Sequence, residues 1–454
     1  MSTRLLKLVI AGAFGAGLVS SPHPAGAQTV ETFQEATASG RVLGGISDPR
    51  LAEIVSGVLA RNPRIAQARA RARAARLQAP QMKALPDPML GATAFGSMPE
   101  TRVGPQTIMG TVSQRFPWFG KLSLREKAAL QRADALDADV EALRLNLVTE
   151  TRRLYYETAF LDAWRDVVDA DRETLIQFEE LARSRYSSGV GIEQAVVKVQ
   201  AEITRDEMRL LDIETRRATT ISALNSLRDL PQNTAVPKLS LPSYSEIPLD
   251  RDTLRARAMA LRPEMSQADS EIARAETLVD LARKEYKPDI TVAATYTRVG
   301  LRSDPAGIAS PPPDNGKDVF AISASINLPI KRGKLRAGVD EAAEVRTTAA
   351  EGKRSVVTDI DRSLGELSDR IALTFQQLRL FDRVLGLQAD QSLRSAQAAY
   401  ASGSLSSLDL LDAERVLLEV RTATERARAD YAIAIARLEG AVGEPLTASG
   451  GLQP

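Results

Sequence analysis

Cysteine is absent from this 454-residue chain, which excludes disulfide bonds and a lipid-modified N-terminal cysteine. The single histidine, His23, lies in an N-terminal segment that we expect to be removed. The remaining chain therefore lacks the two side chains that most zinc and copper sites use. We expect no cofactor, no metal site and no enzymatic chemistry.

Aromatic residues and long apolar runs are also scarce. Aromatic side chains make up only 4% of the chain, whereas alanine, leucine, arginine and glutamate are abundant, which favours long helices over a thick globular core. Beyond residue 27 there is no run of about 18 apolar residues, so no transmembrane helix is expected. Basic and acidic residues are balanced, 59 against 58, and nucleic acid is not an expected partner.

The N-terminus has the pattern of a secretory signal over residues 1–27. Arg4 and Lys7 precede an apolar stretch from Leu8 to Val19, and Ala25-Gly26-Ala27 fits cleavage after small residues. We expect the mature chain to be exported across the inner membrane.

What the sequence does contain is an internal duplication, at an interval of about 200 residues. Each copy combines short alternating segments with helix-patterned segments that are too long for a compact domain, which predicts an elongated architecture completed by other subunits. The matched motifs are Arg61-Asn62-Pro63 with Leu261-Arg262-Pro263, Pro88 with Pro288, Phe116-Pro117 with Leu328-Pro329, Gly120-Lys121-Leu122 with Gly333-Lys334-Leu335, and Tyr186-Ser187-Ser188-Gly189 with Tyr400-Ala401-Ser402-Gly403.

The duplication divides the mature chain into two repeats. Pro231, Pro237, Pro242 and Pro248 prevent a helix between the copies, so that segment reads as a linker lying against the outside of the helices. The expected divisions are an N-terminal extension over 28–47, a first repeat over 48–229, a linker over 230–249, a second repeat over 250–445 and a C-terminal tail over 446–454.

Heptad spacing predicts one long helix in each repeat, Lys121 to Ser187 and Lys334 to Tyr400, each roughly 100 Å long at about 1.5 Å per residue. Shorter helices are expected over 48–85, 191–229, 252–286 and 408–442, and two of them stacked end to end match one long helix. The seam residues are Leu147, Leu154, Leu161, Val168 and Leu175 in the first repeat, and Ile360, Leu364, Leu367, Ile371, Thr374, Leu378, Phe381 and Leu385 in the second.

Four segments have the dyad alternation of strands, at about 89–98, 106–116, 290–301 and 319–328. Ile322 and Ile326 alternate with Ser323 and Ser325, so one face is apolar and the other is small and polar. About ten residues suffice for a tilted strand to cross a bilayer. A half-buried sheet of a soluble domain has a similar pattern, but the signal sequence and the paired hairpins favour membrane strands. Four strands cannot close a barrel alone, so several copies must share one.

The duplicated strand–strand–long-helix unit, the Tyr-x-x-Gly turns and the aspartates Asp409 and Asp412 after Gly403 together resemble the TolC family of outer-membrane efflux channels. The stretches Leu85-Pro86-Asp87-Pro88-Met89-Leu90 and Phe116 to Leu122 are most similar to the branch paired with heavy-metal and related resistance-nodulation-division pumps. The resemblance covers residues 48–445.

This resemblance implies a mainly α-helical fold with membrane strands. Three chains would form a homotrimer with a twelve-stranded barrel in outer-membrane lipid, continued by a coiled-coil tunnel across the periplasm. It further implies an exit duct for small molecules or ions, fed by an inner-membrane pump of the resistance-nodulation-division type through a periplasmic adaptor.

The resemblance also implies which residues form the functional sites. Tyr186, Gly189, Glu193, Tyr400 and Gly403 would shape the periplasmic tip where the adaptor docks. Asp409 and Asp412 would narrow the channel, although two solvated aspartates at a helix start would give the same pattern.

Two departures bear on the closed tip. Leu405 stands where the family's best-known member has a basic residue, and Ala195, the sixth residue after Gly189, stands at the place that Asp409 occupies in the second copy. The polar contacts that hold the tip closed need not be those of that member.

Two other protein classes have some of these features. A secreted structural coiled-coil protein, such as an adhesin stalk without transport activity, would have the signal and the heptads but not the paired strand hairpins. A pump adaptor would need a compact β-rich domain that the sequence does not show.

Overall fold

The computed structural model describes residues 37–446. The expected signal over 1–27, the first part of the extension over 28–47 and nearly all of the tail over 446–454 lie outside the described residues. The described end of the extension forms a short helix, α1 (Ala38–Gly44), which was not expected.

The described chain is mainly helical with four strands, in the predicted order. The first repeat forms α2 (Pro49–Arg61), α3 (Pro63–Arg76), α4 (Gln78–Lys83), β1 (Met89–Ala94), β2 (Gln106–Phe116), α5 (Lys121–Ser187) and α6 (Glu193–Leu227). The second repeat forms α7 (Arg251–Leu261), α8 (Pro263–Lys284), β3 (Ile290–Val299), α9 (Pro305–Ala309), β4 (Val319–Ile326), α10 (Arg332–Leu380), the π-helix η1 (Phe381–Leu385), α11 (Gly386–Ser402) and α12 (Ser407–Val442).

Proline breaks the two helices that precede the strands, where single helices over 48–85 and 252–286 were expected. Asn62 and Arg262 have extended backbone because the following prolines, Pro63 and Pro263, disfavour the helical conformation in the residue before them. Each proline then occupies the first position of the next helix, where its missing N–H costs nothing.

The four strands form one antiparallel sheet in the order β1-β2-β3-β4. The hairpins β1–β2 and β3–β4 are joined through the pairing of β2 with β3, in which Phe116 lies opposite Ile290 and Gln114 opposite Val292. This register places Phe116, Ile290 and Ile326 on one face. Neither β1 nor β4 has a partner on its outer edge within the described residues.

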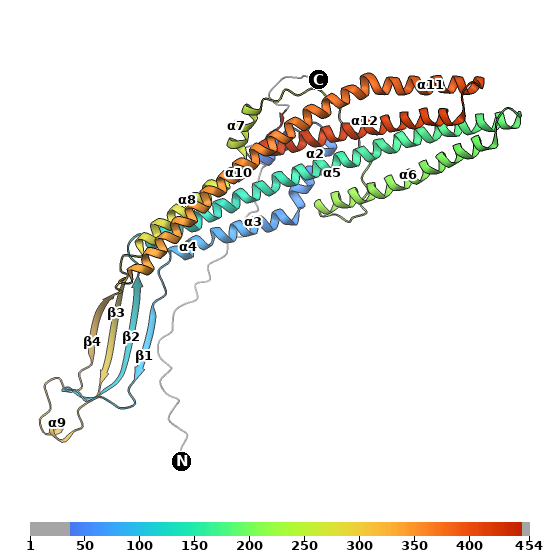
Figure 1. Cartoon of the computed structure of the whole chain (residues 1–454). Coiled ribbons are helices and arrows are strands. Elements are labelled where there is room, and N and C mark those ends of the chain that lie inside the picture. The colour runs from blue at the N-terminus through green and yellow to red at the C-terminus, as the bar shows by residue number, and fades with distance from the viewer. Residues whose placement is uncertain (1–36, 447–454) are drawn as a thin grey trace, which may run out of the picture. The chain divides into compact units, whose positions relative to one another are not determined.

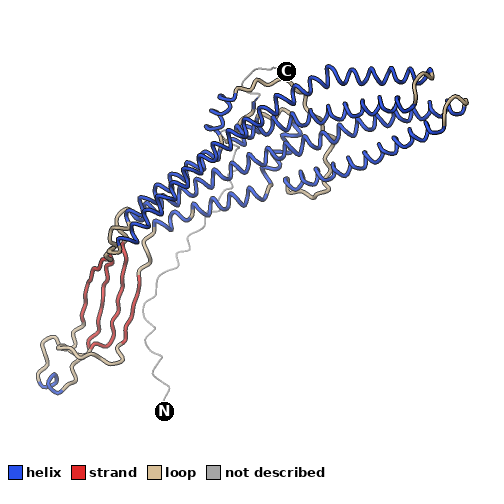
Figure 2. The backbone as a smooth tube through the Cα atoms, in the orientation of Figure 1, coloured by secondary structure: helices blue, strands red, loops and turns tan. Residues whose placement is uncertain are grey.

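The long helix α5 begins at one end of the sheet and leads away from it, flanked by α3 and α4 near the strands and by α6 farther away (Figures 1 and 2). Helix α8 packs against both α5 and α10. The heptad seam of α5 is confirmed, because Leu147, Leu154, Leu161, Val168 and Leu175 are all buried. Shorter helices therefore do pack along one long helix, although α2, α3 and α4 together take the place of one of the two that were expected.

The second long helix contains an unexpected π-helical turn, η1, over Phe381–Leu385. Its seam is buried at Ile360, Leu364, Leu367, Ile371 and Leu378 and half-buried at Thr374 and Phe381, but Leu385, at the end of η1, is exposed. A π-turn has one extra residue, which rotates the following side chains away from the seam. The four-three spacing therefore holds as far as Phe381, which packs on the core, and was wrongly extended to Leu385.

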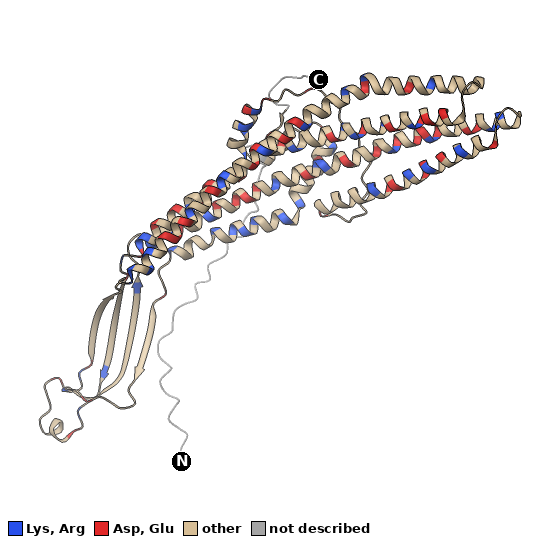
Figure 3. Ribbon diagram, viewed as in Figure 1, with Lys and Arg blue, Asp and Glu red and all other residues tan. Residues whose placement is uncertain are grey.

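Charged residues are concentrated on the helices, and the strands carry few (Figure 3). None of the helices within the described residues is both long and apolar enough to cross a membrane.

Candidate functional site

The two Tyr-x-x-Gly turns end the two long helical segments. Gly189 and Gly403 both have a left-handed backbone, with φ of +72° and +82°. The Gly403 N–H donates to the carbonyl of Tyr400, and the Ser404 N–H donates to Ala399. The duplicated motif is thus a helix-ending turn that needs glycine.

Arg185 joins the two turns, a contact that neither repeated motif indicated. Its Nη1 donates to the carbonyl of Tyr400 and lies 3.4 Å from the carbonyl of Ala401. Its guanidinium carbon lies 4.9 Å from the centre of the Tyr400 ring. The only signal in the sequence was an asymmetry between the copies, because the residue matching Arg185 in the second copy is Ala399.

The other expected tip residues differ in exposure. Tyr400 is buried beneath Arg185, whereas Tyr186 is exposed, as is Glu193 at the first position of α6. Tyr186 and Glu193 are therefore open to solvent beside the turns, while Tyr400 helps to hold the turns together.

Asp409 and Asp412 lie in the first two turns of α12, and both are exposed. The Asp409 N–H donates to Ser406 Oγ over 3.3 Å, and the Ser406 hydroxyl donates back to the Asp409 carboxylate over 2.6 Å. Asp409 therefore has a helix-capping role within one chain. Its carboxylate still points to solvent, so a channel role is compatible with the cap.

Asp171 of α5, Asp206 of α6 and Glu414 of α12 form a buried carboxylate cluster, in which Glu414 stands two residues after Asp412. Burial, and then contact with Glu414, raises the pKa of Asp171 to about 8. Burial, and then contact with Asp171, raises the pKa of Asp206 to about 7. Burial also raises the pKa of Glu414. Asp171 and Asp206 therefore gain or lose their protons near neutral pH at this three-helix contact.

Arginine side chains of α6 and α12 pair with carboxylates in and next to the cluster. Arg209 donates to Asp206 over 2.6 Å, and Arg205 and Arg415 both pair with the buried Glu202. One oxygen each of Asp171, Asp206 and Glu414 has no hydrogen-bond donor within residues 37–446. Besides burial, the excess of carboxylates over hydrogen-bond donors favours the protonated forms of Asp171 and Asp206.

The Gly-Lys-Leu motif at the junction of strand and helix is structural. Lys121 is fully buried, and its Nζ lies 2.9 Å from Asp289 Oδ1, 3.1 Å from Glu285 Oε2 and 3.1 Å from the Lys287 carbonyl. Arg115 and the Trp118 N–H also donate to Asp289. Despite the desolvation of its carboxyl, these donors lower the pKa of Asp289 to about 2. The junction between β2 and α5 is thereby locked to the entry of β3.

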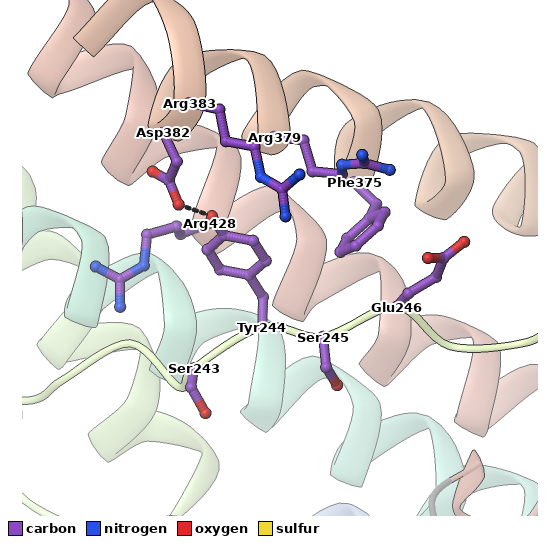
Figure 4. Close-up of a pocket in the computed structure, with 9 residues that line it drawn as sticks. All are labelled: Ser243, Tyr244, Ser245, Glu246, Phe375, Arg379, Asp382, Arg383 and Arg428. Atoms are coloured by element: carbon purple, nitrogen blue, oxygen red, sulfur yellow. Dashed lines mark hydrogen bonds between the residues drawn. The ribbon is translucent and has the colours of Figure 1, made fainter. Parts of the chain in front are cut away.

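The inter-repeat linker packs on the helices through aromatic and polar contacts. Tyr244 donates its hydroxyl hydrogen to Asp382 of η1, and its ring lies 6.3 Å from that of Phe375. Beside it is a cavity of about 660 Å³ with a polar, arginine-rich wall (Figure 4). The cavity is lined by Ser243, Tyr244, Ser245, Glu246, Phe375, Arg379, Asp382, Arg383 and Arg428.

No group of His, Cys, Asp or Glu side chains between residues 37 and 446 is arranged to hold a metal ion.

Comparison with known proteins identifies the family. The model of the outer membrane efflux protein family matches residues 54–228 and 254–444, most of the chain. The probable outer membrane lipoprotein SilC of Salmonella typhimurium is 26% identical over 67% of this chain, and the chain spans just under two thirds, 65%, of that relative. The solvent efflux pump outer membrane protein SrpC of Pseudomonas putida is 25% identical over 70% of this chain and 67% of its own length.

The solved structure of the outer membrane protein VceC from Vibrio cholerae has the same fold, with a TM-score of 0.73 over 90% of this chain and 100% of VceC at 22% identity. The resemblance and the fold class predicted from the sequence, strands continued by long helices, are confirmed. The chain belongs to the outer membrane efflux protein family and is, rather than an enzyme, an efflux channel of the outer membrane that extends into the periplasm.

Proposed function

We propose that three copies of this chain form one continuous exit duct in a tripartite efflux system. The observation that carries the proposal is the four-stranded sheet with two unpaired edges, β1 and β4. Unpaired backbone groups are not tolerated in lipid, so the edges must meet those of other copies. Three copies give twelve strands, with the coiled-coil helices continuing the barrel into the periplasm.

The periplasmic adaptor docks at the tip formed by the turns at Gly189 and Gly403. Tyr186 and Glu193 are exposed there, and Arg185 fixes the spacing of the two turns. The likeness to a solvent efflux pump component supports an inner-membrane pump as the source of cargo. The pump, rather than this chain, selects the small molecule or ion.

Asp409 and Asp412 form the constriction at the entrance. Both are exposed and one helical turn apart, so three-fold symmetry places two rings of carboxylates around the axis. Such rings attract cations and narrow the opening.

The test is single-channel recording in planar bilayers on the wild type and the double variant Asp409→Ala/Asp412→Ala. We expect the variant to conduct more, to prefer cations less and to be blocked less by divalent cations. The matched control is Glu419→Ala, an exposed carboxylate farther along α12. If the double variant keeps wild-type conductance, selectivity and block, the aspartates serve only the helix start.

A further inference from the structure

An apolar pocket opens where the strands meet the helices. It has a volume of about 440 Å³, and its wall is formed by residues 116–120 together with Leu85, Leu122 and Ile290. Phe119 in this wall is 79% exposed, and its ring meets the Trp118 ring edge to face. Apolar surface left open in this way is typical of a site that binds an apolar partner.

The pocket continues the apolar face of the sheet. Phe116 and Ile290 lie opposite each other on that face, and Ile326 follows on β4. In an outer-membrane channel that extends into the periplasm, the strands lie in the bilayer and the long helices lie outside it. The pocket therefore lies at the periplasmic boundary of the bilayer, where aromatic side chains are favoured.

Basic residues gather beside the pocket, and the start of α10 is blue in Figure 3. Segments 284–288 and 330–336 contain a single acidic residue, Glu285, which pairs with Lys121 and Arg125. Within residues 37–446 none of the basic residues of these segments forms an ion pair. They are the half-buried Lys284 and the exposed Lys287, Lys331, Arg332, Lys334 and Arg336.

Contacts join the pocket to these basic residues. A Cβ placed on Gly120, which lines the pocket, would lie 3.7 Å from Nζ of Lys284. Tyr286 follows two residues later, and the guanidinium carbon of Arg332 lies 5.5 Å from the centre of its ring. The apolar pocket and the unpaired cations are thus parts of one surface.

The basic residues at the start of α10 oppose the dipole of that helix. Lys331 is the N-cap residue and makes no capping hydrogen bond with its side chain, and the first turn contains no acidic residue. Arg332 and Lys334 stand in this turn, where cations are unfavourable. An anion bound from outside would offset the repulsion.

We propose that this surface binds an anionic phospholipid of the periplasmic leaflet, with an acyl chain against Trp118 and Phe119 and the phosphate at Lys284 and Arg332. A phospholipid combines the two chemistries that the surface offers, an apolar chain and a negative headgroup. Each basic residue near a bilayer favours anionic lipid by about five-fold. The site requires the strands to lie in the outer membrane, but it does not depend on the number of chains in the channel.

Trp118 provides the measurement, because it lines the pocket and is one of two tryptophans in the chain. The variant Trp164→Phe leaves it as the single reporter. The protein is reconstituted in phosphatidylcholine bilayers to which either phosphatidylglycerol or phosphatidylcholine with acyl chains brominated near the headgroup is added. We expect brominated phosphatidylglycerol to quench Trp118 at a mole fraction lower by about five-fold or more.

The matched variants are made in the same single-tryptophan protein. Lys284→Gln/Arg332→Gln should remove most of the preference for phosphatidylglycerol. Arg346→Gln/Arg370→Gln is the control, with the same change of charge, and should keep the preference. Both control residues are exposed on α10, farther from the strands, and neither forms an ion pair in the part of the chain that the structure describes.

A second variant and a competitor complete the test. Lys331→Gln/Lys334→Gln changes only exposed side chains and should also lower the preference, which covers the case in which the first variant folds poorly. Excess glycerol 3-phosphate should leave the quenching unchanged. If it abolishes the preference, the cations bind free phosphate esters and the lipid site is wrong.

Stronger quenching by phosphatidylglycerol that both variants lower and the control keeps supports the proposal. Equal quenching by the two brominated lipids, or a preference that both variants keep, overturns it. Variants that keep the preference but lower the temperature at which trimers dissociate on a gel would assign the cations to a contact between copies instead.

Discussion

Gly403 is the residue on which the tip depends most sharply. Its φ of +82° lies in the left-handed region, and a Cβ placed there would lie only 3.2 Å from Nη2 of Arg185. A β-branched residue in this conformation is strained by about 1–2 kcal/mol. It would also push Arg185 from the carbonyl of Tyr400.

We therefore expect Gly403→Val to abolish efflux while trimer assembly and outer-membrane insertion persist. The measurement is resistance of a deletion strain complemented with the variant. The matched control is Gly352→Val, since Gly352 lies within α10 with open space around its Cα. Normal resistance at normal expression would remove this turn from the functional account.

The buried carboxylates predict a pH dependence. The folded-state pKa of Asp171 is about 8, above its ordinary value of 3.8, so folding takes up a proton between these values. The resulting stabilisation is full below about pH 4 and is lost as the pH rises through 8. Asp171→Asn should flatten this slope and raise the unfolding temperature at pH 8, measured by circular dichroism in detergent.

The control for that variant is Asp169→Asn, a half-buried carboxylate two residues away on α5 that pairs with Arg165. It should retain the wild-type slope between pH 4 and 8. A slope unchanged by Asp171→Asn would show that this carboxyl is ionised in the fold.

The sequence located the glycine turns but not the groups that hold them. Glycine is specified by backbone conformation, which a local motif encodes. The contact of Arg185 with Tyr400, and that of Asp171 with Glu414, each join residues more than 200 positions apart. A single sequence does not specify which distant residues will meet. The roles of Tyr186, Glu193, Asp409 and Asp412 remain predictions.

At the scale of elements, the strand alternation makes a direct prediction. Ile322 lies opposite Ala294 on the apolar face, and Ser323 lies opposite Ala293 on the small polar face. Ile322→Arg should cost about 2–4 kcal/mol if the site is near the bilayer midplane. Ser323→Arg should be tolerated and should change conductance.

The comparison is made by measuring the yield of assembled protein in the outer membrane and then the conductance of each variant. Equal losses of assembly at the two adjacent positions would contradict the assignment of the faces.

Helices were predicted more reliably than their interruptions. The bounds of α5 match the expected 121–187 because no proline interrupts its heptads. The breaks at Pro63 and Pro263 were missed, although the prolines themselves had been singled out as a repeated motif. The π-turn at Phe381–Leu385 has no comparable local marker, and the expected strand at 89–98 ends at Ala94.

At the scale of the whole molecule, duplication explains why the chain is incomplete alone. Two copies of one unit give a four-stranded sheet with two unpaired edges, and the proposed trimer would close these edges between chains. The coiled-coil alternative of an adhesin-like protein gives no reason for such a sheet, and the family match excludes it.

Native mass spectrometry of the protein extracted from outer membranes in mild detergent tests the central claim most directly. The account predicts ions of three mature chains, because only shared strands satisfy the edges of β1 and β4. Single-chain ions throughout, from protein whose strands are fully formed, would contradict it.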